Sequence, residues 1–277
     1  MTESPSMMPS ATISDAEFAQ FQRFIYQVAG ISLADSKKVL LMGRLGKRVR
    51  TLELASFGEY YQYVVSGQDA LERQTMIDLL TTNETYFFRE EAHFNFLRQV
   101  IVPQHPKGQA LDVWSAASST GEEIYTLCMV LADEMGVQGA WSILGSDLST
   151  RVLEAARRGQ YWLDRVRGLP QEYLKKYCLK GVRNQEGSFL IAPELRRHTR
   201  FQQVNLNADL PDLGKFHVIF LRNVMIYFDN DTKRKVVARL VEKLRPGGYL
   251  IVGHSESLNG INDRVRVVKP TIYQLPA

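Results

Sequence analysis

The stretch LDVWSAASSTGEEIY, residues 111–125, decides the fold. It starts as a short apolar run, continues through very small residues from Ser115 to Gly121, and becomes helical at about Ile124. A strand, a turn of small residues and a helix N-terminus together form the usual cradle for a nucleotide-like ligand. Small side chains let a ligand approach the backbone, and the start of the helix offers unpaired N–H groups. The segment therefore predicts an α/β domain with a ligand site at this turn.

Two acids at this turn, Glu122 and Glu123, indicate the charge of the ligand. A dinucleotide fingerprint needs three spaced glycines, and only Gly121 is present here. Carboxylates suit a cationic ligand, and S-adenosylmethionine, which carries an ammonium and a sulfonium, fits that description. The residues are equally compatible with an ordinary βα turn, capped by Ser119 or Thr120, in which the glutamates favour the helix dipole. This stretch by itself leaves both interpretations open.

The composition indicates a globular protein. The chain has 277 residues, of which 45% are hydrophobic and 23% are charged. It contains no run of 18 apolar residues, and residues 1–13 lack the basic and apolar regions of a secretory signal, so we expect a disordered lead-in and no membrane insertion. The two cysteines lie far apart and indicate neither a disulfide framework nor a zinc site. We expect a cytoplasmic monomer without a metal.

Residues 14–82 predict an all-α N-terminal domain. Ser14 and Glu17 form a capping box, and apolar spacing predicts helices over about 15–29, 36–52, 56–66 and 69–81. The second helix is strongly basic and contains no acid between its basic residues, which are Lys37, Lys38, Arg44, Lys47, Arg48 and Arg50. Such a face is typical either of a solvated surface or of a surface that docks onto an acidic partner.

After a linker and helix over residues 83–108, residues 109–277 alternate between strand and helix patterns. This alternation predicts a mostly parallel sheet with an antiparallel end. A stretch at about 177–200 has no room for a crossover helix, so we expect a small antiparallel β insertion there.

Polar residues gather at the predicted strand ends, where ligands of such sheets bind. They are Ser115–Glu123, Asp147, Asn205 and Asn223–Tyr227. Asp147 ends the second predicted strand and is placed to hydrogen-bond a ribose diol, although it is also placed to cap the next helix.

Five segments, in this order, resemble the chemotaxis receptor methyltransferase (CheR) family: TTNETYFFRE, WSAASSTGEEIY, GSDLS, FHVIFLRNVMIYFD and LRPGGYLIVGHSES. The resemblance covers nearly the whole chain. It implies an α/β, Rossmann-like methyltransferase sheet with a small antiparallel β insertion, preceded by an all-α domain. It further implies transfer of a methyl group from S-adenosylmethionine to glutamate side chains on the cytoplasmic helices of chemoreceptors, which leaves S-adenosylhomocysteine.

The resemblance also implies roles for individual residues. The cofactor site would comprise Asn83, Thr85, Arg89, Glu123, Asp147, Asn205, Leu206, Asn223 and Val224. Within this set Glu123 would contact the methionine end and Asp147 the ribose. Arg89 would orient the acceptor carboxylate and Tyr227 would supply a hydroxyl at the same oxygen. The alternatives are a surface ion pair of Arg89 with a neighbouring glutamate, and core packing of Tyr227.

The partner surfaces follow from the same resemblance. The basic residues Lys37, Arg44, Lys47, Arg48 and Arg50 would face the acidic receptor helices. The β insertion would form the β-subdomain, which in some members tethers a C-terminal pentapeptide of the receptor. Here Arg183 stands where tethering members tend to have another glycine.

Two other functions compete with this reading. The mildly basic net charge of +4 suggests a nucleic-acid methyltransferase as an alternative. However, the segment Asn223–Ile226 lacks the Pro-Pro-aromatic run that is usual where the acceptor is an amine, so we expect no nucleic-acid partner. A binding module that senses S-adenosylmethionine without catalysis is the other.

Overall fold

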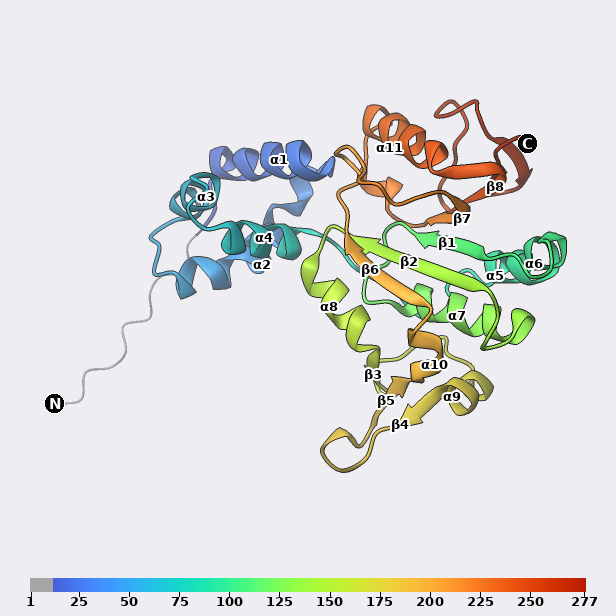
Figure 1. Cartoon of the computed structure of the whole chain (residues 1–277). Coiled ribbons are helices and arrows are strands. Elements are labelled where there is room, and N and C mark those ends of the chain that lie inside the picture. The colour runs from blue at the N-terminus through green and yellow to red at the C-terminus, as the bar shows by residue number, and fades with distance from the viewer. Residues whose placement is uncertain (1–11) are drawn as a thin grey trace. The chain divides into compact units, whose positions relative to one another are not determined.

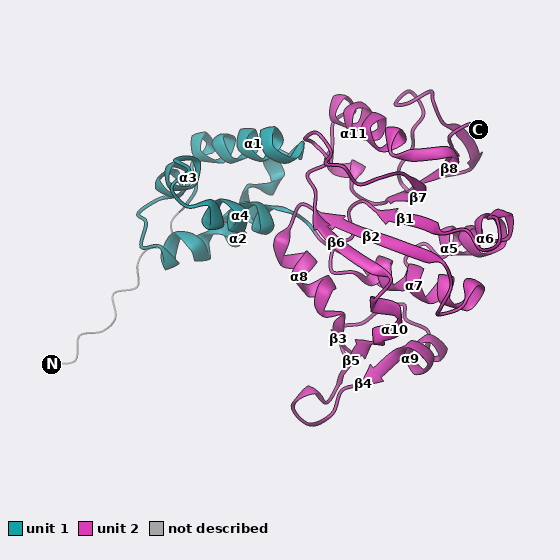
Figure 2. Cartoon of the chain, in the orientation of Figure 1, with its two compact units in different colours: residues 1–82 teal, residues 83–277 magenta. Residues whose placement is uncertain are grey.

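The computed structural model describes residues 12–277, so almost all of the expected lead-in lies outside the described residues (Figure 1). The chain divides into two compact units, residues 1–82 and residues 83–277, here called the N-terminal and C-terminal units (Figure 2). Among the helices of the described chain, none combines the length and apolar character that crossing a membrane requires.

The N-terminal unit contains the four expected helices. They are α1 (Asp15–Ala29), α2 (Lys38–Thr51, preceded by the 3-10 turn Asp35–Lys37), α3 (Phe57–Val65) and α4 (Ala70–Leu80). The capping box at Ser14 and Glu17 is present, and Ser56 and Asp69 cap α3 and α4. Phe21, on α1, is completely buried in the unit's core.

The C-terminal unit is built on a seven-stranded sheet with the order β6-β2-β1-β7-β8-β10-β9. The strands are β1 (Leu111–Ser115), β2 (Trp141–Asp147), β6 (Thr199–Gln203), β7 (Phe216–Leu221), β8 (Leu244–Val252), β9 (Arg266–Lys269) and β10 (Ile272–Gln274). The first five in this order pair in parallel, and β10 pairs antiparallel with β8 and with β9, so the sheet has the expected antiparallel end. The chain leaves β1 toward β2 and later returns on its other side as β7, so the strand order reverses between β1 and β7. A ligand crevice is expected beyond the carboxyl ends of these two strands.

Helices cover the sheet. They are α5 (Ala92–Phe96), the π-helical turn η2 (Leu97–Ile101), α6 (Val102–Gln104), α7 (Glu122–Met135), α8 (Thr150–Arg158) and α11 (Asn230–Glu242). Phe94 of α5 and Ile124 of α7 share one buried cluster with Val113 and Phe220 of the sheet. Trp114, which alternates with Val113 along β1, is also completely buried. Both faces of the central strands are therefore covered, which leaves the strand ends for chemistry.

The β insertion is larger than expected. It is a three-stranded antiparallel sheet with the order β3 (Gln160–Trp162), β5 (Ser188–Ile191) and β4 (Cys178–Lys180). The expected bounds of about 177–200 therefore start too late, and they end inside β6 of the main sheet. Strand β3 is too short to show a period in the sequence and is fixed by pairing with β5, far along the chain, so a local pattern does not reveal it. Helices α9 (Gln171–Tyr177) and α10 (Pro193–Arg196) complete this region.

Candidate functional site

The turn between β1 and α7 is held in an unusual backbone conformation. Gly121 has a φ of 98°, and a Cβ at this position would lie 2.9 Å from the Cβ of Ala156 and 3.0 Å from the Tyr161 hydroxyl. Ser119 adopts a φ of 48°, which is uncommon for a residue other than glycine. Its hydroxyl donates to the carbonyl oxygen of Asn83, 2.8 Å away. The turn is thus fixed before any ligand arrives, and only glycine fits at position 121.

Asp147 ties this turn to the end of β2. Its side chain accepts hydrogen bonds from the backbone N–H groups of Ser119 (2.9 Å) and Ser149 (3.0 Å), one on each carboxylate oxygen. The residue is 8% exposed. Ser149, not Asp147, caps α8 by accepting from the N–H of Val152. The capping alternative for Asp147 is therefore filled by another residue, and its ribose role stays a prediction.

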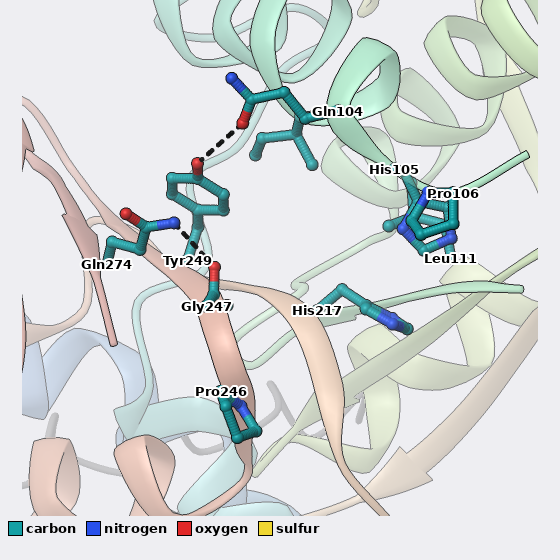
Figure 3. A pocket seen from close by; sticks show the side chains of 11 residues that line it. Gln104, His105, Pro106, Leu111, His217, Pro246, Gly247, Tyr249 and Gln274 are labelled. Carbon is teal, nitrogen blue, oxygen red and sulfur yellow. Dashed lines mark hydrogen bonds between the residues drawn. The ribbon is translucent and has the colours of Figure 1, made fainter. Parts of the chain in front are cut away.

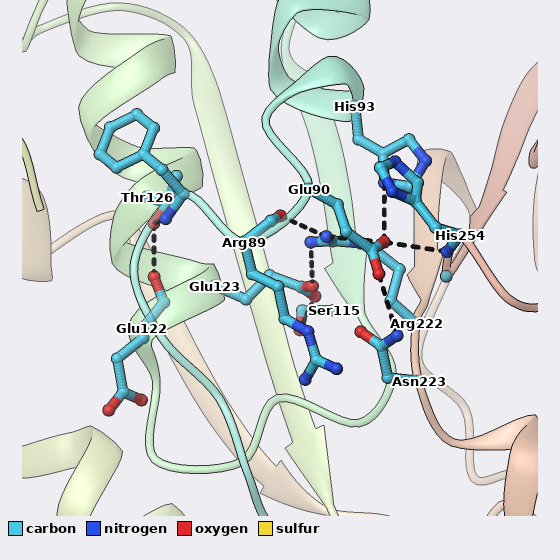
Figure 4. Close-up of polar contacts among 12 residues, drawn as sticks. Arg89, Glu90, His93, Ser115, Glu122, Glu123, Thr126, Arg222, Asn223 and His254 are labelled. Atoms are coloured by element: carbon cyan, nitrogen blue, oxygen red, sulfur yellow. Dashed lines mark hydrogen bonds and ion pairs between the residues drawn. The ribbon is translucent and has the colours of Figure 1, made fainter. Parts of the chain in front are cut away.

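Arg222, directly after β7, is the charged centre of the site, and the sequence reasoning gave it no role. Its side chain is 2% exposed and pairs with Glu123 at 2.8 Å and with Glu90 at 3.1 Å (Figure 4). It also donates to the carbonyl oxygen of Arg89 and lies over the ring of Phe94. A cation buried to this extent requires carboxylate partners. An arginine directly after an apolar strand was therefore the signal in the sequence for a buried ion-pair network.

Both carboxylate oxygens of Glu123 have hydrogen-bond partners within this network. Its Oε1 accepts from the hydroxyl of Ser115 at 2.7 Å, and its Oε2 accepts from Arg222. The carboxylate of the neighbouring Glu122 accepts from Thr120 Oγ1 at 2.6 Å, and no other described side chain hydrogen-bonds it. Burial raises the pKa of Glu122. The electrostatic reason for expecting a cation at Glu123 therefore applies better to Glu122, because Arg222 already neutralises Glu123.

Glu90 connects Arg222 to two other segments. Its Oε1 accepts from Asn223 Nδ2 at 3.0 Å, and its Oε2 accepts from the backbone N–H of His254 at 3.1 Å. Burial alone would raise the pKa of Glu90, but the hydrogen bond from Asn223 and the charge of Arg222 outweigh it and hold the pKa below its usual value. Phe88, Glu90 and Asn223 all have φ between 55° and 59°. Strained backbone of this kind clusters at functional sites.

Glu256 holds the loop after β7 in place through backbone hydrogen bonds. It is 7% exposed and accepts from the N–H groups of Gly253 (2.7 Å), Asn223 (2.9 Å) and Ile226 (3.3 Å). Burial raises its pKa despite these hydrogen bonds. The sequence reasoning did not assign Glu256 a role, although it lies at a strand end in the segment GHSES.

Arg89 remains without a carboxylate. Its Nη1 donates to the carbonyl oxygen of Glu84 at 2.9 Å, and its guanidinium lies 5.6 Å from the centre of the Tyr86 ring. Within residues 12–277 it forms no ion pair, because Glu90 pairs with Arg222 instead. The alternative of a surface ion pair with a neighbouring glutamate is therefore not found.

The remaining predicted site residues lie in the loops around the same strand ends. Asn205 follows β6, and its Oδ1 accepts from the N–H of Asn207 at 2.9 Å. Leu206 is buried and Val224 is half-buried. Thr85 and Tyr227 are half-buried, and neither hydroxyl forms a hydrogen bond with the described part of the chain. The structure brings Arg89, Glu123 and Asn223 together through Arg222 and Glu90, and joins Asp147 to Asn83 through Ser119.

The basic helix α2 uses two of its arginines inside the N-terminal unit. Arg44 donates to the carbonyl oxygens of Leu80 (3.1 Å) and Thr81 (3.2 Å) at the end of α4. Arg48 forms a two-pronged ion pair, at 2.9 and 2.5 Å, with Glu72, which is only 4% exposed. These two residues hold α2 against α4. The exposed candidates for docking are Lys37, Lys47 and Arg50.

A cavity of about 240 Å³ lies at the other end of the sheet (Figure 3). Its lining includes Leu111 and His217, near the starts of β1 and β7, and Tyr249 of β8, which is paired with Val218 near the start of β7. These are the amino ends of the strands, so this cavity is separate from the crevice at their carboxyl ends.

Comparison with known families agrees with this geometry. The model of the CheR methyltransferase SAM-binding domain matches residues 83–274, so the fold and site are those of an S-adenosylmethionine-dependent methyltransferase. The model of the CheR methyltransferase all-alpha domain matches residues 16–81. The chain belongs to the CheR methyltransferase family, and its cofactor is S-adenosylmethionine.

Individual proteins are similar over almost the whole chain. The chemotaxis protein methyltransferase of Escherichia coli strain K12 is 40% identical over 273 residues, which are 97% of this chain and 94% of the relative. Chemotaxis protein methyltransferase 2 of Pseudomonas aeruginosa is 38% identical over 278 residues, 97% of this chain and 99% of the relative. The solved glycopeptide N-methyltransferase MtfA overlaps 72% of this chain and 62% of its own, at 18% identity and a TM-score of 0.37, too low a similarity to support an inference.

Proposed function

We propose that this methyltransferase modifies glutamate side chains on the cytoplasmic helices of chemoreceptors and forms glutamate methyl esters. Relatives at 38–40% identity are named chemotaxis protein methyltransferases, which supports a chemoreceptor substrate. The observation that carries a carboxylate acceptor is Arg89. It is an arginine in the strand-end region whose guanidinium has no carboxylate partner in the described chain, whereas Arg222 has two. A planar fork of donors that has no carboxylate partner is suited to bind one.

Methyl transfer to a carboxylate requires alignment of the reacting atoms more than acid–base catalysis. A glutamate carboxylate has a pKa of about 4.3 and is already ionised at neutral pH. S-adenosylmethionine supplies the methyl group when it is bound. Arg89 would hold the acceptor carboxylate in line with the methyl–sulfur bond, and the unpaired hydroxyl of Tyr227 would donate to the same carboxylate. Such alignment can recover about 7–11 kcal/mol of a reaction barrier.

The cofactor fits the residues present. The turn of small residues that ends at Gly121 is held in place, because a Cβ at Gly121 would meet Ala156 and Tyr161, and small side chains let a ligand approach the backbone. Asp147, at the end of β2, would accept from the ribose hydroxyls. Glu122 offers its carboxylate to the ammonium of the methionine end, while Glu123, through Arg222, positions the loop after β7. Asn83, Asn205 and Asn223 would complete the site.

Two surfaces are proposed to contact the receptor. Lys37, Lys47 and Arg50 would attract acidic receptor helices, with a salt-dependent contribution to association. The β insertion would tether the receptor's C-terminal pentapeptide. Arg183, in the loop between β4 and β5, has a φ of 54°, a conformation that glycine adopts without strain, which supports the correspondence with the glycine of tethering members.

The test is incubation with methyl-labelled S-adenosylmethionine and receptor fragments, with and without their C-terminal tails. We expect base-labile label on the receptor, which identifies an ester. Arg89→Ala should bind the cofactor normally and lose turnover, whereas Arg234→Ala, at an exposed position on α11, should retain both. Label on RNA or DNA but not on receptor, or normal turnover by Arg89→Ala, would contradict the proposal.

A further inference from the structure

Three potential metal ligands converge beside the Arg222 network. The ligand atoms of Glu90, His93 and His254 all lie within 4.8 Å of one another (Figure 4). Glu90 precedes α5, His93 lies on α5, and His254 follows β8, so three segments meet at this point. The ring centres of the two histidines are 4.9 Å apart. The group lies outside the cofactor residues considered so far, except that Glu90 contacts Asn223.

The hydrogen bonds of His93 leave one ring nitrogen with a bare lone pair. Thr271 Oγ1 donates its proton to the carbonyl oxygen of Pro270 at 2.6 Å. The tautomer with the ring proton on His93 Nε2, which donates to Thr271 Oγ1 at 2.8 Å, is the one that satisfies both contacts. His93 Nδ1 is then an acceptor. It is buried without a hydrogen-bond partner, in a side chain that is 1% exposed.

This lone pair faces another acceptor. Glu90 Oε2 lies 3.5 Å from His93 Nδ1. This oxygen already accepts from Arg222 Nη2 and from the N–H of His254, so His93 Nδ1 is the acceptor that lacks a partner, and a buried acceptor of this kind is unfavourable unless a cation binds it.

The surrounding charge favours a cation despite Arg222. Within residues 12–277 the carboxylates of Glu90 and Glu123 share this single guanidinium, which also donates to the carbonyl oxygen of Arg89. Arg222 Nη2 lies 3.1 Å and His93 Nδ1 3.5 Å from the same oxygen, Oε2 of Glu90, so an ion at His93 would share this oxygen with the guanidinium.

The spacing suits a tetrahedral transition-metal ion. Zinc binds imidazole nitrogen at about 2.0–2.1 Å and carboxylate oxygen at about 2.0–2.2 Å, which places two ligand atoms about 3.4 Å apart. The separation of His93 Nδ1 and Glu90 Oε2, 3.5 Å, is close to this value. His254 is exposed, so its ring is free to move the ångström or so that full coordination requires, and water would complete the shell.

We propose that Glu90, His93 and His254 bind a zinc-class divalent ion. Two imidazoles and one carboxylate are a ligand set for zinc and its neighbours and not for magnesium or calcium. Because Glu90 also holds Asn223, the ion would act on the cofactor site. Its charge would weaken binding of S-adenosylmethionine, which carries a sulfonium, more than binding of S-adenosylhomocysteine, which does not. This coupling rests on the cofactor roles proposed above.

The experiment is a zinc titration of the chelator-treated full chain against a chromophoric competitor, repeated with Co²⁺ and its visible absorption. We expect one site, weakened more than tenfold in His254→Ala and in His93→Gln, in which the amide replaces the donor to Thr271. His105→Ala is the matched control, because His105 and His217 form a second pair of rings, also 4.9 Å apart. It should leave the site unchanged.

The outcomes separate the claims. Unchanged zinc binding in both His254→Ala and His93→Gln, or equal loss in His105→Ala, would overturn the site and indicate adventitious surface binding. If His93→Gln fails to fold, His254→Ala still decides, because its side chain is exposed. Calorimetry with and without zinc then tests the coupling, and equal effects on donor and product would refute it. The methyl-transfer assay of the proposed function is independent of these titrations.

Discussion

Replacing Arg222 with methionine removes the cation of a buried network while keeping the length of the side chain. It leaves the carboxylates of Glu90 and Glu123, which are 11% and 12% exposed, facing each other without a counter-charge. Breaking a buried pair in this way typically costs about 3–5 kcal/mol. Since small domains are stable by about 5–15 kcal/mol, the variant should fold with a clearly lower free energy of unfolding.

Tryptophan fluorescence during urea unfolding measures this loss of stability in the C-terminal unit, which contains Arg222. The three tryptophans, Trp114, Trp141 and Trp162, all lie in the C-terminal unit. A chelator in the buffer keeps metal ions out of the comparison. The control is Arg234→Met, because Arg234 pairs with Asp231 on the surface, with the two side chains 52% and 79% exposed, and its loss should change stability by about 0.5 kcal/mol or less.

A second substitution tests the cause. Glu123→Gln in the Arg222→Met background removes one of the two unpaired carboxylates and should recover about 1–2 kcal/mol. The reasoning is refuted if Arg222→Met costs less than about 1 kcal/mol, or if the double variant is no more stable than the single one.

Three further outcomes are expected. Asp147→Asn should weaken S-adenosylmethionine binding about tenfold in calorimetry, because one acceptor is lost, and unchanged affinity would remove the ribose role. Glu122→Gln should weaken binding of S-adenosylmethionine, while the urea midpoint of unfolding stays the same or rises. The reason is that the neutral amide avoids the cost of burying a charge, which also raises the pKa of this carboxyl. A lower midpoint with normal affinity would mean that Glu122 has a structural role. Arg48→Met should destabilise the N-terminal unit by about 3–5 kcal/mol through its pair with the buried Glu72, followed by far-UV circular dichroism, while Lys47→Met should cost about 0.5 kcal/mol or less. Similar losses in the two variants would contradict the distinction between structural and exposed cations on α2.

Local patterns were enough for most of the fold. The capping box at Ser14, the apolar period of the helices and the alternation after Leu111 predicted the helical unit and the mostly parallel sheet, including its antiparallel end. These patterns work because a helix or a long buried strand is encoded by neighbours in the sequence. Strand β3 was not predicted, because three residues are too few to show a hydrophobic period and its partner strand β5 is distant in the sequence.

The site divides in the same way. The sequence by itself determined the turn at Gly121, the acids beside it and the acid at the end of β2, because each follows a strand whose pattern is local. Only the tertiary structure decided which acid has a cationic partner. Arg222 follows a strand about a hundred residues after Glu123, yet it neutralises that glutamate, whereas Glu122 forms no ion pair with the described residues. Likewise, Glu90, His93 and His254 share no spacing that a motif would reveal. Electrostatic interactions depend on distance in space, and chain folding alone sets that distance.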